Sequence, residues 1–515
     1  MRLGVACLLV ALSGFIALSY EILWFRVFSF ASGGAAPAFA TMLGAYLLGI
    51  ALGARVAGRV CRGDRTCDPG QLRLVAFFVL AGNLAGFASV PLCAFFFAQL
   101  AGAWIPLAIV VLVAGLLGAQ FPLIAHYGVA ADHLAGARIS YLYVCNIAGS
   151  VSGSLLTGFV LMDHLSLATI AMLLTMLGVL TAAGMLAFLG AQPAGRRALV
   201  VVGGLAVVAV LWLSTPLLFA GLFERLQYRQ DYAGQRFKHV IETKSGVITV
   251  TQDDEVFGGG VYDGVFNLDL VHDRNGLIRP LSLGLVHPAP KRVLLIGLAS
   301  GSWTAVVANH PGVESVTVVE INPGYLELIR LYPEHAHLLE DPKVEIIIDD
   351  GRRWLNRNPG RHFDAIISNT TWHWRDQISN LLSLEFHQLI ADHLAPDGVF
   401  LFNTTSSERA MRTALEVFPH GLRIRNNLWV SKAPIVLDAA RWEQQLRTYE
   451  VYDHALFNLE DPRHVERMRE ILGLVDTLAL AAPDPDGLEA GASVRARTQH
   501  LRPITDDNMG HEWRR

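Results

Sequence analysis

Residues of the kinds that bind nucleosides follow four apolar runs in the second half of the chain. In chain order they are Gly297, Ser300 and Gly301, then Glu320, then Asp350 and Gly351, and finally Asn369. Small residues after the first run let the backbone approach a ligand, and a carboxylate after the second can accept hydrogen bonds from ribose hydroxyls. The carboxyl ends of parallel strands meet at one edge of a sheet, so these groups are expected to form one nucleoside-binding crevice.

Two other interpretations of these residues stay open at this point. Glu320 and Asp350 are also of the type that caps helix N-termini without touching a ligand. A nicotinamide cofactor would use the same strand, turn and helix, but the strict G-x-G-x-x-G spacing is absent after residue 296.

The elements that must position these residues are predicted from the pattern of the chain after residue 290. The segments KRVLLIG, LASGSWTAVVANHPGVE and SVTVVEINPGY indicate a buried strand, a glycine turn with a helix, and a second strand. This is the βαβ opening of a Rossmann-like α/β domain of the class I methyltransferase type. Before it, residues 237–268 alternate β-branched residues with Gly and Asp turns, which predicts a small N-terminal subdomain of β-hairpins.

The first 220 residues of this 515-residue chain differ in kind from the rest. They contain ten arginines, no lysine and five acidic residues, a charged fraction far below the roughly 25% of soluble domains. Apolar runs of the roughly 20 residues that cross a bilayer are predicted at 4–25, 37–58, 74–98, 103–126, 141–162, 166–190 and 198–220. This composition excludes a wholly water-soluble protein and predicts a multispanning α-helical membrane domain.

The loop arginines bear on which side of the membrane the second half occupies. Five of them lie between residues 55 and 73, and two more at 196 and 197, so these loops are predicted to face the cytoplasm. Seven spans would then place residues from 221 onward outside. A re-entrant segment near 33–40, or an extra crossing within 74–128, would place them in the cytoplasm, and both sides stay open.

Composition also argues against three other classes of protein or site. Residues 221–515 carry a net charge of about −9, which disfavours nucleic acid as a partner. All five cysteines precede residue 146 and no His cluster accompanies them, so no metal is expected. Polar residues are sparse in the predicted spans, which disfavours a transporter.

The chain resembles a known family, the polyamine aminopropyltransferases or spermidine synthases, and in particular its bacterial members fused to an N-terminal multispanning domain. VYDGVFN, VLLIGLASGS and VEIIIDDGRRWL are similar to the family's L-D-G-x-x-Q, V-L-I-I-G-G-G-D-G-G and V-x-V-x-x-G-D-G-x-x-x-L. FDAIISNTT stands where the family has F-D-V-I-I-x-D-S-S-D, and GAYLLGIALGARVAGR is similar to the fused members. The resemblance implies a multi-pass protein of the bacterial inner (plasma) membrane with a small-molecule amine acceptor, and a homodimer is also expected.

The resemblance further implies which positions bind the co-substrate, S-adenosylmethionine or its decarboxylated form. Glu320 would hold the ribose, Asp350 would take the adenine amino group, and Asn267 stands where a family Gln contacts the nucleoside. The full set assigned to the donor is Asn267, Gly297, Ser300, Gly301, Glu320, Asp350 and Gly351.

The acceptor side departs from the family pattern. Three acidic family positions are occupied here by Ser300, Asn369 and Trp372. The acids at these positions hold a polycationic amine and accept a proton from the attacking nitrogen, which an amide does not do. Methyl transfer to another acceptor, and a catalytically inactive nucleoside-binding sensor or scaffold in the membrane, therefore stay as alternatives.

The loop after Asn369 is predicted to cover the site. Trp372, Trp374 and Arg375 are assigned to a substrate lid, which suits an aromatic or anionic acceptor better than a polyamine. The predicted catalytic residues are Asn369, His373 and Asp376, with His373 or Asp376 as the replacement base. A packed loop with a surface arginine is the non-catalytic alternative.

These predictions divide the chain into three parts. Residues 1–220 form the transmembrane domain, 221–290 the linker and small β subdomain, and 291–515 the Rossmann-like domain with a C-terminal extension. That extension ends in ITDDNMGHEW, whose acids and His511 indicate either a metal site or a tail docked against the domain. The predicted function is a membrane-anchored spermidine synthase-like transferase, nominally moving an aminopropyl group to a polyamine.

Overall fold

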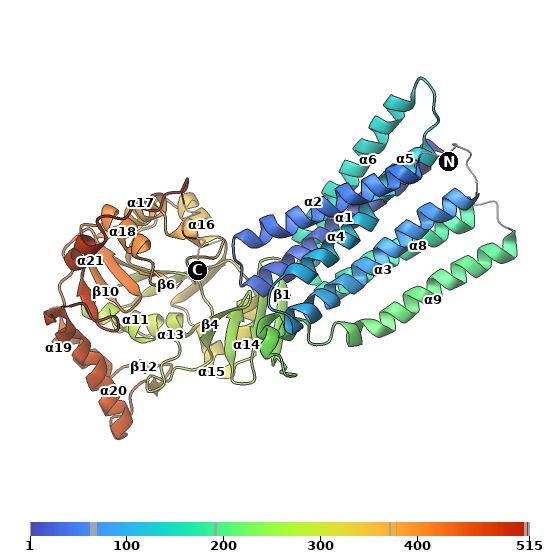
Figure 1. The fold of residues 1–515 in the computed structure, drawn as a ribbon. Coiled ribbons are helices and arrows are strands. Elements are labelled where there is room, and N and C mark those ends of the chain that lie inside the picture. The colour runs from blue at the N-terminus through green and yellow to red at the C-terminus, as the bar shows by residue number, and fades with distance from the viewer. Residues whose placement is uncertain are drawn as a thin grey trace. The chain divides into compact units, whose positions relative to one another are not determined.

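The computed structural model describes residues 2–61, 69–189, 193–369, 372–376, 378–480, 482–508 and 512 (Figure 1). Contacts between residues divide the chain into two compact units. The first comprises Met1–Gly33, Pro37–Phe237 and Glu242–Val247, and the second comprises Gly34–Ala36, Lys238–Ile241 and Ile248–Arg515.

The first unit is a bundle of long apolar helices. Its helices are α1 (Leu3–Ser32), α2 (Pro37–Val60), α3 (Pro69–Gln99), α4 (Trp104–Gly118), α5 (Gln120–Gly128), α6 (Ala135–Leu156), α7 (Met162–His164), α8 (Leu167–Gly184), α9 (Ala194–Leu218) and α10 (Leu222–Tyr228). Among the described residues, seven helical segments are long and apolar enough to cross a membrane, by length and composition. Two of the seven, Leu72–Gln99 and Trp104–Gly128, account for the region 74–128, so the described residues there contain no extra crossing.

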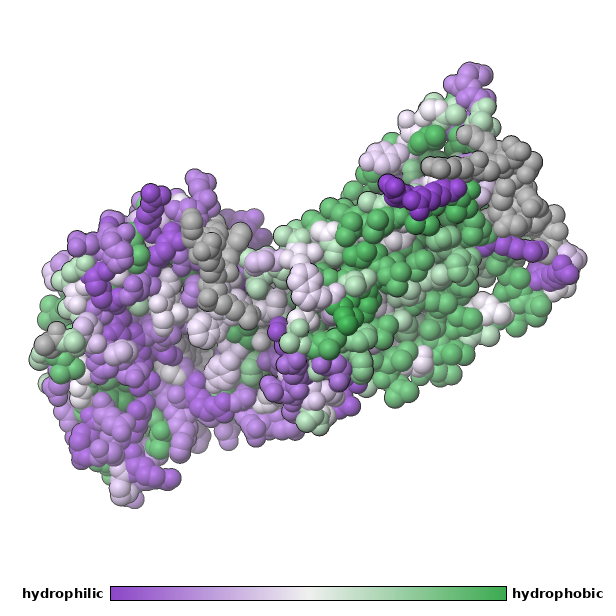
Figure 2. Space-filling view, in the orientation of Figure 1, coloured by the Kyte–Doolittle hydropathy of each residue, from purple (hydrophilic) through white to green (hydrophobic). Residues whose placement is uncertain are grey.

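Small residues let the helices of this unit approach one another closely. A Cβ on Gly153 of α6 would lie 2.8 Å from the Cα of Phe15 on α1, so α6 packs against α1 with no side chain between them. The outward-facing side chains are apolar: Leu213 and Leu217 of α9 are 78% and 79% exposed. Figure 2 shows apolar residues over much of the surface of the long helices, which is the surface a lipid-facing bundle would present.

The second unit begins with the predicted hairpins. Four strands, β1 (His239–Thr243), β2 (Gly246–Val250), β3 (Glu255–Gly258) and β4 (Val261–Val265), form a sheet in that order, and β3 pairs antiparallel with both β2 and β4. Two short helices follow, α11 (Ile278–Leu281) and α12 (Leu283–Val286).

A large mixed sheet forms the centre of this unit. Its strands are β5 (Arg292–Ile296), β6 (Ser315–Glu320), β7 (Val344–Ile348), β8 (Phe363–Ser368), β9 (Leu394–Asn403), β10 (His420–Ile424), β11 (Asn427–Ser431) and β14 (Leu488–Ala490). The order is β14-β10-β11-β9-β8-β5-β6-β7. Neighbouring strands from β9 to β7 in this order are parallel, whereas β11 is antiparallel to β9, β10 to β11, and β14 to β10. Successive strands β5, β6 and β7 extend the sheet in one direction, and β8 and β9 extend it from the other side of β5, so a switch point, where ligands bind in open α/β sheets, lies between β5 and β8.

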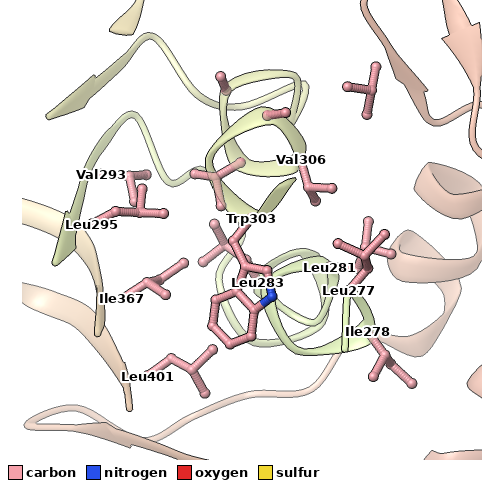
Figure 3. Packing of buried hydrophobic residues seen from close by; sticks show 14 of the residues in the cluster. Leu277, Ile278, Leu281, Leu283, Val293, Leu295, Trp303, Val306, Ile367 and Leu401 are labelled. Carbon is pink, nitrogen blue, oxygen red and sulfur yellow. The ribbon is translucent and has the colours of Figure 1, made fainter. Parts of the chain in front are cut away.

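Helices lie along this sheet and bury its two faces. They are α13 (Ser302–Ala308), α14 (Gly324–Arg330), α15 (Pro333–Ala336), α16 (Gly351–Arg357), α17 (Leu384–His393), α18 (Glu408–Val417), α19 (Ala439–Arg447), α20 (Pro462–Gly473) and α21 (Gly491–Thr498), with a two-stranded ribbon of β12 (Glu450–Val451) and β13 (His454–Ala455). On one face, Trp303 of α13 packs among Leu283, Leu295 and Leu401 (Figure 3). The methyltransferase-like α/β fold predicted from the strand pattern is therefore present.

Candidate functional site

Backbone hydrogen bonds join the glycine turn after β5 to both neighbouring strands. The Gly297 N–H donates to the Val319 carbonyl of β6 at 2.9 Å, and the Asn369 N–H after β8 donates to the Ile296 carbonyl at 2.9 Å. Gly297 has a φ of 95°, and a Cβ there would lie 2.6 Å from the Asn369 carbonyl oxygen. Only glycine fits this position, and it brings the predicted residues Gly297 and Asn369 together.

The other two glycines assigned to the donor face protein side chains. A Cβ on Gly301 would lie 2.7 Å from Leu338 Cδ2, and a Cβ on Gly351 would lie 2.6 Å from Ile296 Cγ2. Both glycines thus allow a helix to begin close against its neighbours. The hydroxyl of Ser300, which precedes Gly301, shares a hydrogen bond of 2.9 Å with the Ser302 hydroxyl.

The carboxylate of Glu320 is buried at the end of β6. Its Oε2 accepts the Leu298 N–H and its Oε1 accepts the Asn322 N–H, both at 2.7 Å. Burial raises the pKa of Glu320 to about 7, although these two hydrogen bonds favour the ionised form. A carboxylate has about four lone-pair positions, so Glu320 can accept two further hydrogen bonds from a ligand.

Asp350 lies after the neighbouring strand and caps a helix. Glu320 is the register partner of Ile348 in the parallel pair of β6 and β7, and Asp350 follows Ile348 by two residues. The Asp350 Oδ1 accepts the Arg353 N–H at 2.7 Å as the N-cap of α16. Asp350 therefore caps a helix, as one of the two interpretations expected. The carboxylates of Glu320 and Asp350 also lie at the carboxyl ends of adjacent strands, as predicted.

Asn267 holds a buried acceptor atom that nothing in the described part of the chain satisfies. Its Oδ1 has no hydrogen-bond partner there, whereas its backbone carbonyl accepts Asn275 Nδ2 at 2.7 Å. A buried unpaired acceptor costs roughly 1–3 kcal/mol, so it is expected where a ligand supplies the missing donor. The resemblance assigned Asn267 to the nucleoside, and that assignment stays a prediction, since Asn267 is not among the residues that line the cavity beside the glycine turn.

A cavity of about 160 Å³ opens beside the glycine turn. Its lining comes from the β4 hairpin, the loop before α11, the turn after β5 and the loops after β8, β9 and β10. The lining residues are Tyr262, Asp263, Gly264, Arg274, Asn275, Arg279, Leu298, Ala299, Ser300, Ser302, Trp303, Asn369, Trp372, Asn403, Thr405 and Asn426. Ser300, Asn369 and Trp372, which occupy the three acidic family positions, all line this one cavity.

The remaining residues of the predicted lid and catalytic set lie around the cavity rather than in its lining. His373 Nδ1 is 2.6 Å from the Thr405 hydroxyl, which does line it. Arg375 donates to the Gly258 carbonyl of β3 at 3.3 Å, so its guanidinium packs on the hairpin. Trp374 and Asp376 belong to the same short segment and are not among the lining residues.

The structure adds a half-buried acidic group that sequence reasoning missed. Asp263 accepts a hydrogen bond from the Tyr325 hydroxyl, and the positive charge of Arg375 lies close enough to stabilise its carboxylate. Burial nevertheless raises the pKa of Asp263, and burial together with Asp263 and Glu320 raises the pKa of Tyr325. The signal was present in the segment VYDGVFN, where Asp263 is the only acid.

The acidic C-terminal segment docks against the domain. Asp506 forms a two-fold ion pair with Arg352 of α16, at 2.8 and 2.6 Å, and Glu512 pairs with Arg409 at 2.6 Å. His511 lies outside the described residues. No group of three His, Cys, Asp or Glu side chains in the described ranges is placed to hold a metal ion.

Comparison with known proteins points to one family. Residues 282–418 match the spermine/spermidine synthase domain. The chain is 32% identical over 172 residues to a polyamine aminopropyltransferase of Desulforudis audaxviator, covering 31% of this chain and 60% of that protein, which is less than two thirds of its length. It is 25% identical over 419 residues to one of Mycobacterium tuberculosis (strain H37Rv), covering 78% of this chain and 77% of that protein.

A solved structure is similar to part of the chain. The crystal structure of spermidine synthase from Thermotoga maritima is 23% identical, covers 46% of this chain and 88% of its own, and has a TM-score of 0.35. Residues 282–418, which match the spermine/spermidine synthase domain, include the turn after β5, Glu320, Asp350 and Asn369. Both relatives described above are polyamine aminopropyltransferases. Residues 282–418 thus form a spermine/spermidine synthase domain by their match to that family, and the chain is similar in sequence to polyamine aminopropyltransferases.

Proposed function

We propose that this protein transfers an aminopropyl group from decarboxylated S-adenosylmethionine to an amine, while anchored in the bacterial inner membrane by its first unit. The observation that carries the proposal is the orphaned Asn267 Oδ1. It lies in the segment that leads from β4 towards the cavity, and its backbone carbonyl contacts Ser302 of the turn that also carries Ser300. A nucleoside held by Asn267, Glu320 and Asp350 would direct its sulfonium arm past Gly297 towards Ser300 and Asn369.

The chemistry asked of these residues is positioning. The acceptor nitrogen forms a bond to the carbon beside the sulfonium, the C–S bond breaks, and its electron pair leaves with methylthioadenosine. Such an in-line displacement gains most from alignment of the two reactants and exclusion of water. Trp372 and Trp303, which both line the cavity, provide apolar walls for that purpose.

The attacking nitrogen must lose a proton, and Asn369 does not accept one. His373 is assigned as the proton acceptor, because its ring nitrogen contacts the Thr405 hydroxyl and Thr405 lines the cavity. In this proposal the proton passes to His373 through the Thr405 hydroxyl. Replacing His373 with Gln would then lower kcat and change its pH profile, while leaving binding of methylthioadenosine intact.

The experiment that tests the proposal uses the full chain purified in detergent. Calorimetric titration with methylthioadenosine is expected to show binding, and Asn267→Ala is expected to weaken it at least tenfold, since one hydrogen bond to a buried group is lost. Asn358→Ala, a change at the end of α16, is the matched control. No binding by the wild-type protein, or equal binding by Asn267→Ala, would overturn the assignment.

The membrane part of the proposal has a separate test. The seven apolar helical segments support a multi-pass protein. Reporters fused after residue 515 that are active on only one side of the membrane would assign the side of the second unit. Recovery of the full chain in a carbonate-washed soluble fraction would contradict membrane insertion.

A further inference from the structure

The cavity beside Ser300 is lined by cations and amides where a polyamine site needs acids. Its described lining contains two arginines, Arg274 and Arg279, and a single carboxylate, Asp263. The other polar groups are neutral: Tyr262, Asn275, Ser300, Ser302, Asn369, Asn403, Thr405 and Asn426. A polycationic acceptor would find no free acid in this lining to balance its charge.

The single carboxylate is already engaged within the protein. Asp263 accepts the Tyr325 hydroxyl, and the charge of Arg375 stabilises it from the hairpin side. Arg375 is in turn fixed by its hydrogen bond to the Gly258 carbonyl. Asp263 therefore serves to hold β4 against the start of α14.

One of the two arginines is also compensated. Arg274 forms an ion pair with Glu255 of β3, and its guanidinium lies 5.9 Å from the centre of the Tyr262 ring. Its side chain is about half exposed, so water and Glu255 together satisfy its charge.

Arg279 differs, because none of the described carboxylates forms an ion pair with it. Its Nη2 donates to Asn426 Oδ1 at 2.6 Å, its buried Nε has no hydrogen-bond partner, and it forms no ion pair within the described ranges. The closest acid, Asp273, accepts the N–H groups of Leu277 and Ile278 instead. Burial lowers the pKa of Arg279, the charge of Arg425 lowers it further, and Asp273 only opposes this.

The guanidinium of Arg279 is also held in place. Arg279 belongs to α11, whose Ile278 and Leu281 are buried in the core together with Leu277 (Figure 3). A half-buried cation that is fixed in position and lacks an anion is costly unless a ligand supplies the negative charge. Arginine is suited to that role, since its planar donors match a carboxylate.

We infer that this cavity binds a carboxylate group, held by Arg279 with Ser300 and Asn369 as neutral hydrogen-bonding neighbours. The inference rests on the proposed function for the nucleoside beside it. The carboxylate has two sources: an acceptor that bears an acid as well as an amine, or the methionine end of S-adenosylmethionine, which would then replace the decarboxylated donor of the proposed reaction. Both sources agree with the loss of acids at Ser300, Asn369 and Trp372.

The test compares matched ligands with and without a carboxylate on the full chain in detergent. For the donor, the dissociation constants of S-adenosylmethionine and its decarboxylated form are measured by calorimetry. For the acceptor, turnover with decarboxylated donor is measured with 4-aminobutyrate and with putrescine, which differ by a carboxylate in place of one terminal aminomethyl group. We expect at least a tenfold preference for the carboxylate ligand in one arm, and the arm that shows it identifies the source.

Variants assign that preference to one side chain. Arg279→Gln, which can still donate to Asn426, is expected to abolish the preference, and Arg279→Lys, which keeps the charge without the planar donors, is expected to retain part of it. Arg330→Gln, at an exposed position on α14, is the control. Equal affinities and rates in both arms, or a preference that Arg279→Gln leaves intact, would overturn the inference.

Methylthioadenosine separates this inference from the proposed function. It has no carboxylate, so its binding reports on the nucleoside residues alone. If the wild-type protein does not bind methylthioadenosine, the nucleoside site is refuted. If it binds methylthioadenosine but shows no preference for carboxylate ligands, only the role of Arg279 is refuted. A variant that fails to fold does not decide the matter, because the wild-type ligand comparison stands without it.

Discussion

The carboxylate of Glu320 accepts the backbone N–H of Leu298 at 2.7 Å and so joins the end of β6 to the turn after β5. The same carboxylate accepts the Asn322 N–H at 2.7 Å through its other oxygen. Glu320 therefore shapes the turn that carries Ala299 and Ser300 into the cavity. Glu320, which is expected to bind ribose, thus also fixes the backbone beside the expected ligand. Substitutions of Glu320 are therefore expected to affect both the stability of the protein and ligand binding.

The stability of the protein is expected to depend on pH through Glu320. Its pKa rises from the ordinary value of 4.5 to about 7 on folding, so the folded state holds the proton more tightly than the unfolded state. The stabilisation from this group is complete below about pH 4.5 and is lost as pH rises through about 7. The loss amounts to about 3 kcal/mol, at 1.36 kcal/mol per pKa unit.

Thermal unfolding of the full chain between pH 4.5 and pH 8 checks this prediction. Glu320→Gln does not ionise at this position, so only the wild type is expected to lose the stabilisation from this group as pH rises. The stability of the wild type relative to the variant is therefore expected to fall between pH 4.5 and pH 8. The glutamine has one acceptor oxygen instead of two, so the pH dependence of the difference, rather than its absolute value, is the measurement. Parallel curves for both proteins would contradict the raised pKa.

The left-handed conformation of Ala299 provides a second prediction. Its φ of 51° is unfavourable for any residue with a Cβ, by roughly 1–2 kcal/mol, and the corresponding family segment has glycine there. Ala299→Gly is expected to leave the melting temperature unchanged or raise it slightly, because relief of strain offsets the added freedom of the unfolded chain. Ala299→Val, with a branched side chain at positive φ, is expected to lower it clearly.

A helical position supplies the control for that experiment. Ala305 lies within α13, where replacement by glycine costs about 1 kcal/mol. If Ala299→Gly destabilises the protein as much as Ala305→Gly does, the strain at Ala299 is absent.

The sequence predicted the parallel core of the sheet well because its local signals were strong. The segments KRVLLIG and SVTVVEINPGY contain the strands Arg292–Ile296 and Ser315–Glu320, and the two later apolar runs are the strands Val344–Ile348 and Phe363–Ser368. Each combines β-branched residues with a following Gly, Asp or Asn, so strand and turn signals agree. The seven apolar segments were equally clear, since water-soluble domains rarely contain apolar runs long enough to cross a bilayer.

The antiparallel edge and the charge balance of the site were not predictable in the same way. Strand β14 pairs with β10 across more than sixty residues, and its three residues have no pattern of their own. The sequence pattern singled out neither Asp263 nor Arg279. Asp263 matters because Tyr325 and Arg375 lie beside it, and Arg279 matters because no described acid pairs with it. Only the tertiary structure determines these neighbours.

The docked C-terminal segment leads to the last prediction, which concerns Glu512. Its side chain is almost completely buried, and its two oxygens accept Arg409 Nη1 at 2.6 Å and the Ser407 hydroxyl at 2.8 Å. Ser407 also caps α18 through the Ala410 N–H, so Glu512 supports the start of that helix. Glu512→Ala leaves the half-buried Arg409 without its anion, which typically costs about 3 kcal/mol.

An exposed ion pair is the matched comparison for Glu512, and a chelator tests the metal alternative. Glu466 pairs with Arg469 on the surface of α20, with both side chains more than half exposed, so Glu466→Ala is expected to cost less than about 1 kcal/mol. The two variants are compared by thermal unfolding of the full chain. If the segment docks through these ion pairs, Glu512→Ala lowers the melting temperature much more than Glu466→Ala does. A chelator is then expected to leave the melting temperature of the wild type unchanged. A large effect of the chelator on the wild type would instead indicate a metal among the terminal acids.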